Sequence, residues 1–159
     1  MSDAAETNEQ RFEKLGLELP PPPGAVGVYK PAITVGGMVY TSGHLPINTD
    51  GSIITGCVGH EIDQDAGYEA ARQCGLAILA TLRQHLGSLD RVKRVIKLTG
   101  MVNSTQAFTG QPAVVNGCSE LMASVFGEDA GVGTRSAVGM SGLPLGAAVE
   151  IEGMFEIDA

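Results

Sequence analysis

Residues 134–157, TRSAVGMSGLPLGAAVEIEGMFEI, contain two strand-like runs separated by the turn residues Gly142-Leu143-Pro144-Leu145-Gly146. In the second run apolar side chains alternate with mainly acidic ones: Val149, Ile151, Phe155 and Ile157 against Glu150, Glu152, Met154 and Glu156. A period of two is typical of a strand that buries one face. We therefore predict strands at about 134–140 and 147–157, joined by a turn rich in Gly and Pro.

The segment before this pair alternates between helix and strand patterns. Residues 63–86 predict a helix that Asp63 or Asp65 caps and Gly87 ends. Its apolar stripe consists mainly of small residues, so the helix is expected to lie close against a sheet. A long strand is predicted over 92–102, and a second helix from Pro112 to Gly127 with a buried stripe of Val114, Cys118, Leu121, Met122 and Val125.

Two further strands, 29–35 and 38–42, are predicted to form a hairpin around Gly36-Gly37, where both glycines can adopt positive φ. Two helices can cover only one face of such a mixed sheet. In the strand 92–102 we expect Ile96, Leu98 and Val102 on one face and Val95 and Met101 on the other. Because apolar residues occupy both faces, we expect the uncovered face to pack in a homo-oligomer.

The N-terminal part differs in composition from the rest of the chain. Residues 1–19 predict a loose tail and a short helix whose apolar contacts are Phe12, Leu15 and Leu19. Pro20–Pro23 favours an extended segment, either a rigid connector or a docking motif for a partner. We therefore expect an N-terminal extension, residues 1–23, and a single domain, residues 24–159.

Composition excludes several classes of function. The 159-residue chain carries 10 Lys and Arg against 18 Asp and Glu, a net charge of −8, and only seven aromatic residues. Such a surface repels phosphates and lacks stacking platforms, so nucleic acid is not an expected partner. Cys57, Cys74 and Cys118 are read as reduced thiols. No run is long enough to span a membrane, and the acidic N-terminus is unlike a signal peptide; we expect a cytoplasmic protein without membrane contact.

Few residues suggest chemistry. His44, His60 and His85 are widely spaced and form no metal-binding motif, so they are interpreted as surface or loop histidines. Arg135 is isolated in the uncharged stretch 131–144, and its planar guanidinium fits a carboxylate with two parallel hydrogen bonds. From chemistry alone it is either a member of a buried ion pair or a substrate clamp. Glu150 is either a polar residue on an exposed strand face or a catalytic carboxylate.

Three separate stretches of the sequence resemble a known family. The stretch TRSAVGMSGLPLGAAVEIE, the block YKPAITVGGMVYTSGHLPIN and the helix segment VVNGCSELMASVFG resemble, in this order, the signature of the Rid (reactive intermediate deaminase) or YjgF family. The resemblance covers roughly residues 24–157. It implies an α+β fold similar to chorismate mutase, with a mixed β-sheet, two helices on one face, and a homotrimer with clefts between subunits.

The resemblance also implies an activity. Family members hydrolyse reactive 2-imino or enamino acids to 2-oxo acids and ammonia, without a cofactor or metal. By position, Arg135 matches the arginine that binds the substrate carboxylate and Glu150 the glutamate thought to act on water. Tyr29, Ser42, Gly43 and Asn116 match residues that line the substrate cleft.

Three departures from the family pattern point to a divergent subgroup. Ala137 stands where the deaminases usually have Cys, Gly133 where Pro is common, and His44 where the T-S-G block usually continues with Gln. The Pro-rich extension is also longer. The first rival hypothesis is a non-catalytic protein that binds small carboxylates or regulates a partner. The second is a ribonuclease, which the net charge of −8 disfavours.

Overall fold

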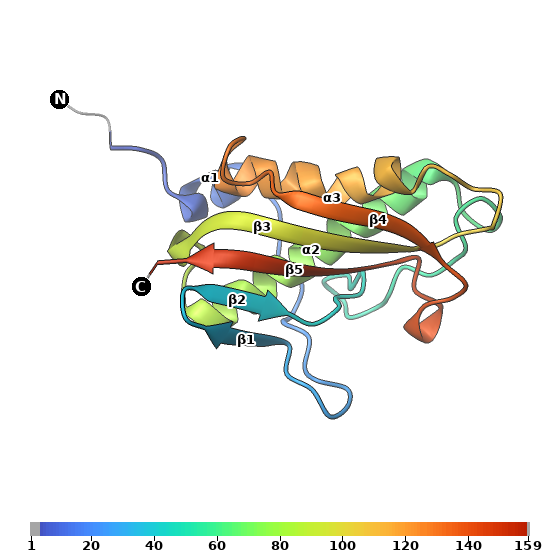
Figure 1. Ribbon diagram of the computed structural model, residues 1–159, viewed down its shortest axis with the longest axis horizontal. Helices are drawn as coiled ribbons and strands as arrows, with labels where there is room; N and C mark the ends of the chain where they lie inside the picture. Colours follow the sequence, from blue (N-terminus) through green and yellow to red (C-terminus); the bar gives the residue numbers. More distant parts are fainter. Residues whose placement is uncertain (1–3, 159) are drawn as a thin grey trace.

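The computed structural model describes residues 4–158, which form three α-helices, two short 3₁₀ helices and five strands (Figure 1). The helices are α1 (Asn8–Lys14), α2 (Gln64–Leu86) and α3 (Gln111–Phe126), with η1 (Leu89–Arg91) and η2 (Pro144–Gly146). The strands are β1 (Ala32–Val35), β2 (Met38–Thr41), β3 (Val92–Asn103), β4 (Thr134–Met140) and β5 (Val149–Ile157). The predicted order of strands and long helices is confirmed.

The five strands form one mixed sheet in the order β1-β2-β5-β3-β4. Only β3 and β4 run parallel, and α3 connects them, as a parallel pair requires a crossover. The predicted hairpin is confirmed by the register Val35↔Met38, with Gly36 at φ 59° in the turn. Its first strand begins at Ala32 and not at residue 29, so Tyr29 lies in the preceding loop.

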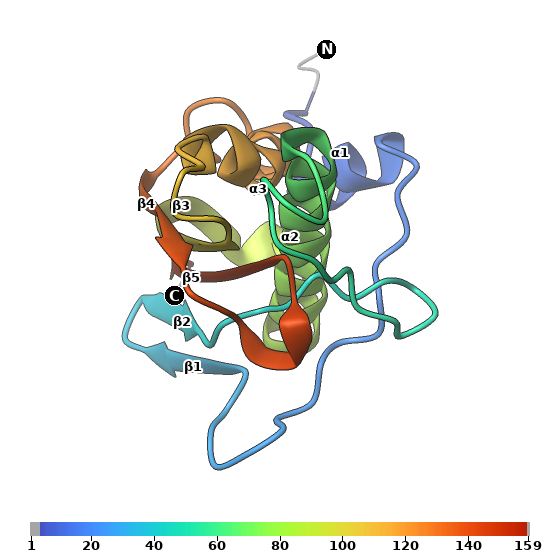
Figure 2. The ribbon, with the colours of Figure 1, turned by 90° about the vertical axis from the view of Figure 1, so that its right-hand side faces the viewer.

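Both long helices lie on the same side of the sheet (Figure 2). Asp63 caps α2 by accepting a 2.8 Å hydrogen bond from the Ala66 amide, and Gly87 ends it with φ 86°. α2 is buried on most of its surface because both α3 and the sheet cover it. Gly117 of α3 lies so close to the α2 backbone at Tyr68 that a Cβ on residue 117 would clash with it. Cys74 and Cys118 are both buried between these elements, which confirms the buried stripe predicted to include Cys118.

One predicted strand face is wrong. The buried side chains of β3 are Val92, Val95, Leu98 and Val102, whereas Ile96 is only partly buried. The pairing of β3 with β5 shifts register between Val95 and Lys97, which marks a bulge. A bulge inserts one residue and reverses which side chains face the core on its far side. Val95 therefore joins the core in place of Ile96.

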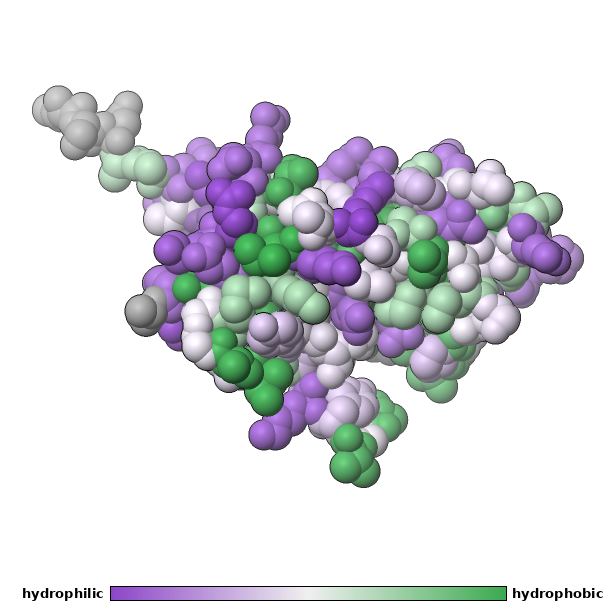
Figure 3. All heavy atoms as spheres, viewed as in Figure 1, coloured by the Kyte–Doolittle hydropathy of each residue, from purple (hydrophilic) through white to green (hydrophobic). Residues whose placement is uncertain are grey.

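The opposite face of the sheet is uncovered. It faces the viewer in Figure 1, with α2 behind it, and hydrophobic side chains appear on it in Figure 3. Ile33, Tyr40 and Met154 form a row across β1, β2 and β5, and each is more than a third exposed. Within residues 4–158, no apolar helix reaches the length needed to cross a bilayer.

The N-terminal segment is attached to the helical side. Phe12 of α1 is buried, and Asn8 donates hydrogen bonds to the carbonyls of Leu89 and Val92 at 3.0 and 2.9 Å. Leu15 is exposed, contrary to expectation, because it follows the last turn of α1. The prolines 20–23 belong to no helix or strand.

Candidate active site

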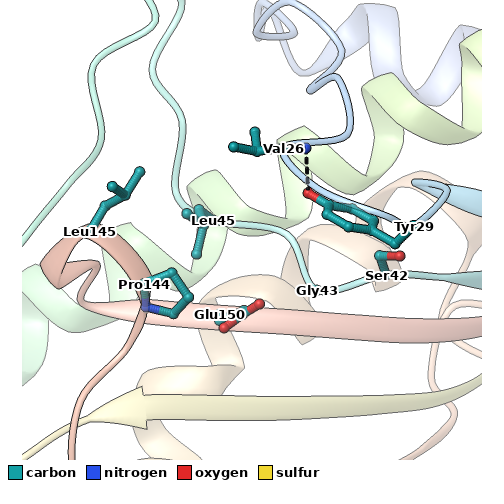
Figure 4. Close-up of a pocket in the computed structure, with 8 residues that line it drawn as sticks. All are labelled: Val26, Tyr29, Ser42, Gly43, Leu45, Pro144, Leu145 and Glu150. Atoms are coloured by element: carbon teal, nitrogen blue, oxygen red, sulfur yellow. Dashed lines mark hydrogen bonds between the residues drawn. The ribbon is translucent and has the colours of Figure 1, made fainter.

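A pocket of about 470 Å³ lies on the uncovered side of the sheet, beside the start of β5. Figure 4 shows its lining, which includes four of the six predicted site residues: Tyr29, Ser42, Gly43 and Glu150. They come from the two segments that flank the β1–β2 hairpin and from β5, about 110 residues further along the chain. The remaining two predicted residues, Arg135 and Asn116, lie elsewhere.

Glu150 is the only charged residue that lines this pocket. Its neighbours Val149 and Ile151 are buried, so the alternation of β5 directs Glu150 to the uncovered face. Partial burial and the nearby charge of Glu152 raise the pKa of the Glu150 carboxyl above its ordinary value. A carboxylate with a raised pKa is a stronger base, as proton transfer near neutral pH requires.

Gly43 provides the space that Glu150 occupies. A Cβ at this position would overlap the Glu150 carboxyl group, so the carboxylate lies directly against the Gly43 backbone. The glycine of the T-S-G block is therefore required because a side chain at residue 43 would collide with Glu150. Its backbone does not adopt a positive φ.

Tyr29 fixes the loop before β1 internally, and Ser42 connects this loop to the segment after β2. The Tyr29 hydroxyl accepts a 3.1 Å hydrogen bond from the Val26 amide. Ser42 donates its hydroxyl to the Lys30 carbonyl at 2.5 Å and its amide to the Pro31 carbonyl at 2.9 Å. These bonds fix the wall of the pocket opposite Glu150 (Figure 4).

His44 lies in the loop after β2, as predicted, but it is buried and not at the surface, whereas His60 and His85 are exposed. The ring Nδ1 lies 2.7 Å from the Ser42 carbonyl, and Nε2 lies 2.7 Å from the Thr81 hydroxyl of α2. Since a carbonyl only accepts, Nδ1 carries the proton and Nε2 accepts from Thr81. Burial lowers the pKa of the His44 ring and favours this neutral form.

Arg135 lies on the helix side of the edge strand β4, where its guanidinium meets α3. Nη1 donates to Asn116 Oδ1 at 2.7 Å and to Ser119 Oγ at 3.1 Å, and Nη2 donates to the Pro112 carbonyl at 3.1 Å. None of the ion pairs within residues 4–158 includes Arg135. A guanidinium has five N–H donors, so one on Nε and one on Nη2 remain for another acceptor.

The structure does not bring Arg135 and Glu150 together within one chain. Strand β3 separates β4 from β5 in the sheet. Arg135 pairs with the buried Leu98 and faces the helices, whereas Glu150 pairs with Met101 and faces the uncovered side. Arg135 and Glu150 therefore line different pockets of the single chain. The chain carries two separate half-sites, the Arg135 half-site (Arg135, Asn116 and Ser119) and the Glu150 half-site (Glu150, Tyr29, Ser42 and Gly43).

Sequence reasoning missed several residues of both half-sites. Ser119 lies three positions after Asn116, a spacing that places two side chains on one face of a helix. Its position beside Asn116 could therefore have been predicted from the sequence. The apolar lining of the pocket was not identified; it consists of Val26, Leu45, Pro144 and Leu145. These four residues come together through the paths of loops, which the hydrophobic periodicity of a sequence does not predict. Among residues 4–158, no three His, Cys, Asp or Glu side chains converge to hold a metal ion.

The structure is that of a small α+β protein in which α3 orients the Arg135 guanidinium and a separate pocket contains the Glu150 carboxylate. Residues 9–152 match the family model described as "YjgF/chorismate mutase-like, putative endoribonuclease". The chain therefore belongs to the YjgF/Rid family, as its sequence blocks predicted.

Individual relatives refine this placement. The protein TCP17 of Trypanosoma cruzi is 42% identical over 147 residues, which cover 92% of each chain. The crystal structure of Atu1372 from Agrobacterium tumefaciens, described as a protein of unknown function, is 42% identical, with a TM-score of 0.86 and coverage of 96% of this chain and 94% of that one. RidA from the Antarctic bacterium Psychrobacter sp. PAMC 21119 is 29% identical, with a TM-score of 0.60 and coverage of 85% and 93%. The chain is thus more similar to Atu1372 than to this RidA.

Proposed function

We propose that this protein is a cytoplasmic homotrimeric hydrolase that converts reactive 2-imino or enamino acids to 2-oxo acids and ammonia without a cofactor. In this proposal each cleft between subunits combines the Arg135 half-site of one copy with the Glu150 half-site of another. We assign catalysis to a single domain, residues 24–159, which follows an N-terminal extension, residues 1–23; helix α1 of this extension packs on the helical side.

The observation that carries the proposal is the unneutralised charge of Arg135. Its guanidinium is held by a side-chain amide, a hydroxyl and a backbone carbonyl, and these neutral groups orient it without cancelling its charge. The two N–H donors that remain suit a carboxylate, which arginine binds with two parallel hydrogen bonds. A structural arginine would instead be expected in an ion pair.

Glu150 is suited to the proton transfers of imine hydrolysis. The carboxylate would take a proton from water as the water oxygen bonds to the imine carbon and the C=N π pair moves to nitrogen, and Glu150 would then give that proton to the nitrogen. In the second step Glu150 would take the hydroxyl proton of the carbinolamine and pass it to the amino nitrogen, which leaves as ammonia as the C=O bond of the 2-oxo acid forms. An imine carbon is already electrophilic, so positioning and general acid–base catalysis are the main contributions required.

A second copy is needed because the half-sites of one chain face opposite sides of its sheet. The exposed apolar row of Ile33, Tyr40 and Met154 offers a surface for such a copy. Strand β4, which carries Arg135, is at the edge of the sheet and is therefore accessible to a neighbouring subunit.

The proposal is tested by ammonia release from a panel of 2-imino acids that an amino-acid oxidase generates in situ. We expect acceleration by the wild type, loss of both turnover and carboxylate binding in Arg135→Ala, and loss of turnover with retained binding in Glu150→Gln. Removing a charged partner of a carboxylate costs about 2–5 kcal/mol, or roughly 30- to 5,000-fold in kcat/KM. Light scattering and thermal unfolding provide the structural controls.

Each alternative has its own outcome. If Arg135→Ala unfolds or dissociates, Arg135 is structural and the site assignment fails. If no imine is hydrolysed but small carboxylates still raise the Tm of the wild type, the protein is a binding or regulatory member. Cleavage of RNA by nuclease-free protein, abolished in Glu150→Gln, would support the ribonuclease activity that the family description mentions; the net charge of −8 argues against it.

A further inference from the structure

The pocket beside Glu150 has apolar walls. Four of its eight lining residues are aliphatic, Val26, Leu45, Pro144 and Leu145, and the ring of Tyr29 extends the same surface (Figure 4). Apart from Glu150, the polar contribution is limited to Ser42 and the Gly43 backbone. An apolar group could enter this space without a desolvation penalty, whereas a second carboxylate would be repelled by the charge of Glu150.

Leu145 is held in an unusual conformation at the pocket. With φ 59° and ψ 17°, it is the only non-glycine residue with positive φ in the described part of the chain. Leucine in this region is strained, and the surrounding turn imposes it: Gly146 donates to the Leu143 carbonyl and Ala147 to the Pro144 carbonyl, both at 3.1 Å. The Leu145 side chain is 75% exposed, so burial does not account for an apolar residue here.

Val26 forms the facing wall. Its side chain is 91% exposed, and its amide donates to the Tyr29 hydroxyl, which holds the loop beside the pocket. Val28, two residues further along, is fully exposed but does not line the pocket. Both valine side chains are exposed and only that of Val26 lines the pocket, so the two form a matched pair for side-chain substitutions.

We propose that Val26, Leu45, Pro144 and Leu145 form a subsite for the side chain of the substrate, and that the protein selects 2-imino acids with bulky apolar side chains. The imines derived from leucine, methionine or phenylalanine fit this description; those derived from alanine and aspartate do not. This inference rests on the proposed function, because the substrate is placed by its reacting carbon at Glu150.

The test compares kcat/KM for imines derived from leucine, alanine and aspartate. The leucine-derived imine is expected to exceed the alanine-derived one by at least about tenfold, since removing a methylene from an apolar pocket costs roughly 10- to 200-fold. The aspartate-derived imine is expected to be the poorest. Equal rates across the three substrates would overturn the proposal.

Three variants assign the preference to the pocket. Leu145→Asn removes the apolar side chain but retains a residue that tolerates positive φ, so folding is preserved. We expect Leu145→Asn and Val26→Ser each to reduce the leucine-to-alanine ratio about three- to tenfold, and Val28→Ser to leave it unchanged. An equal effect of Val28→Ser, or a shift to a smaller oligomer with Leu145→Asn or Val26→Ser, would show that these side chains do not form a substrate subsite.

Failure of the proposed function is recognised separately, as absence of turnover for every imine. In that case, equilibrium binding of 4-methyl-2-oxopentanoate, 2-oxopropanoate and 2-oxobutanedioate measures the pocket preference directly. Tightest binding of the branched 2-oxo acid, weakened by Leu145→Asn and not by Val28→Ser, supports the apolar subsite in a non-catalytic protein. Equal or absent binding overturns it.

Discussion

The Glu150 side chain fills the space beside the Gly43 backbone, so no side chain fits at residue 43. A Cβ at residue 43 would overlap the Glu150 carboxyl group but no backbone atom. In Gly43→Ala the flexible Glu150 side chain is therefore expected to rotate away, with little change in Tm. Because displacement of a catalytic group by about 1 Å can cost on the order of 10²-fold, we expect kcat for imine hydrolysis to fall by about that factor.

The matched control is Gly142→Ala in the turn before η2. No atom lies within 4 Å of a Cβ at that glycine, so this variant is expected to retain wild-type kcat and Tm. Unchanged kcat in Gly43→Ala would mean that the position of the Glu150 carboxylate is not important for turnover.

At the scale of elements, His44 connects the pocket to α2. Its backbone pairs with Ile151 of β5, and its ring bonds to Ser42 and Thr81. Burial lowers the pKa of the ring in the folded protein, whereas the unfolded value is about 6.5. The unfolded chain therefore binds more protons between these two values, and stability is lost as pH falls below about 6.5.

This pH dependence is measured by denaturant unfolding of the wild type and His44→Gln between pH 5 and pH 8. A glutamine amide can donate to the Ser42 carbonyl and accept from Thr81, but it does not titrate. We expect the free energy of unfolding of the wild type, relative to that of His44→Gln, to decrease as the pH is lowered. A constant difference across this range would contradict the assignment of a buried neutral histidine.

Elements could be predicted where a local pattern determines them. The alternation of β5, the Asp63 cap and the Gly36-Gly37 turn all identified structure correctly. The bulge in β3 could not be predicted, because it depends on the pairing of β3 with β5 and produces no recognisable pattern in the sequence. The start of β1 was misplaced for a related reason: its partner β2 ends at Thr41, opposite Ala32.

The candidate site shows the same limit. Its six residues were identified through the family resemblance, and isolation in an uncharged stretch singled out Arg135 independently. Their division into two half-sites depends on strand order, since β3 lies between two strands that are neighbours in sequence. The positive φ of Leu145 depends on the hydrogen bonds of its turn and has no signal in residue type.

At the scale of the whole molecule, the uncovered sheet face is the expected interface between copies. Met154 lies in the exposed row with Ile33 and Tyr40. A charge buried in an apolar interface is strongly unfavourable. If the proposed trimer forms through this face, Met154→Glu is expected to be monomeric at micromolar concentration in light scattering and to lack the proposed imine hydrolysis.

Leu15→Glu is the matched control. It introduces the same charge at an exposed apolar residue that follows α1, away from the sheet face, and is expected to leave the oligomer intact. A trimeric Met154→Glu variant would show that another surface joins the copies.

The most direct test of the composite site mixes two inactive variants. Arg135→Ala and Glu150→Gln, co-expressed with different tags and purified as mixed trimers, each provide the half-site that the other lacks. If every cleft combines half-sites from two copies, each mixed trimer contains one intact cleft, so up to about a third of wild-type imine hydrolysis should return. Mixed trimers as inactive as their parents would contradict a site shared between subunits.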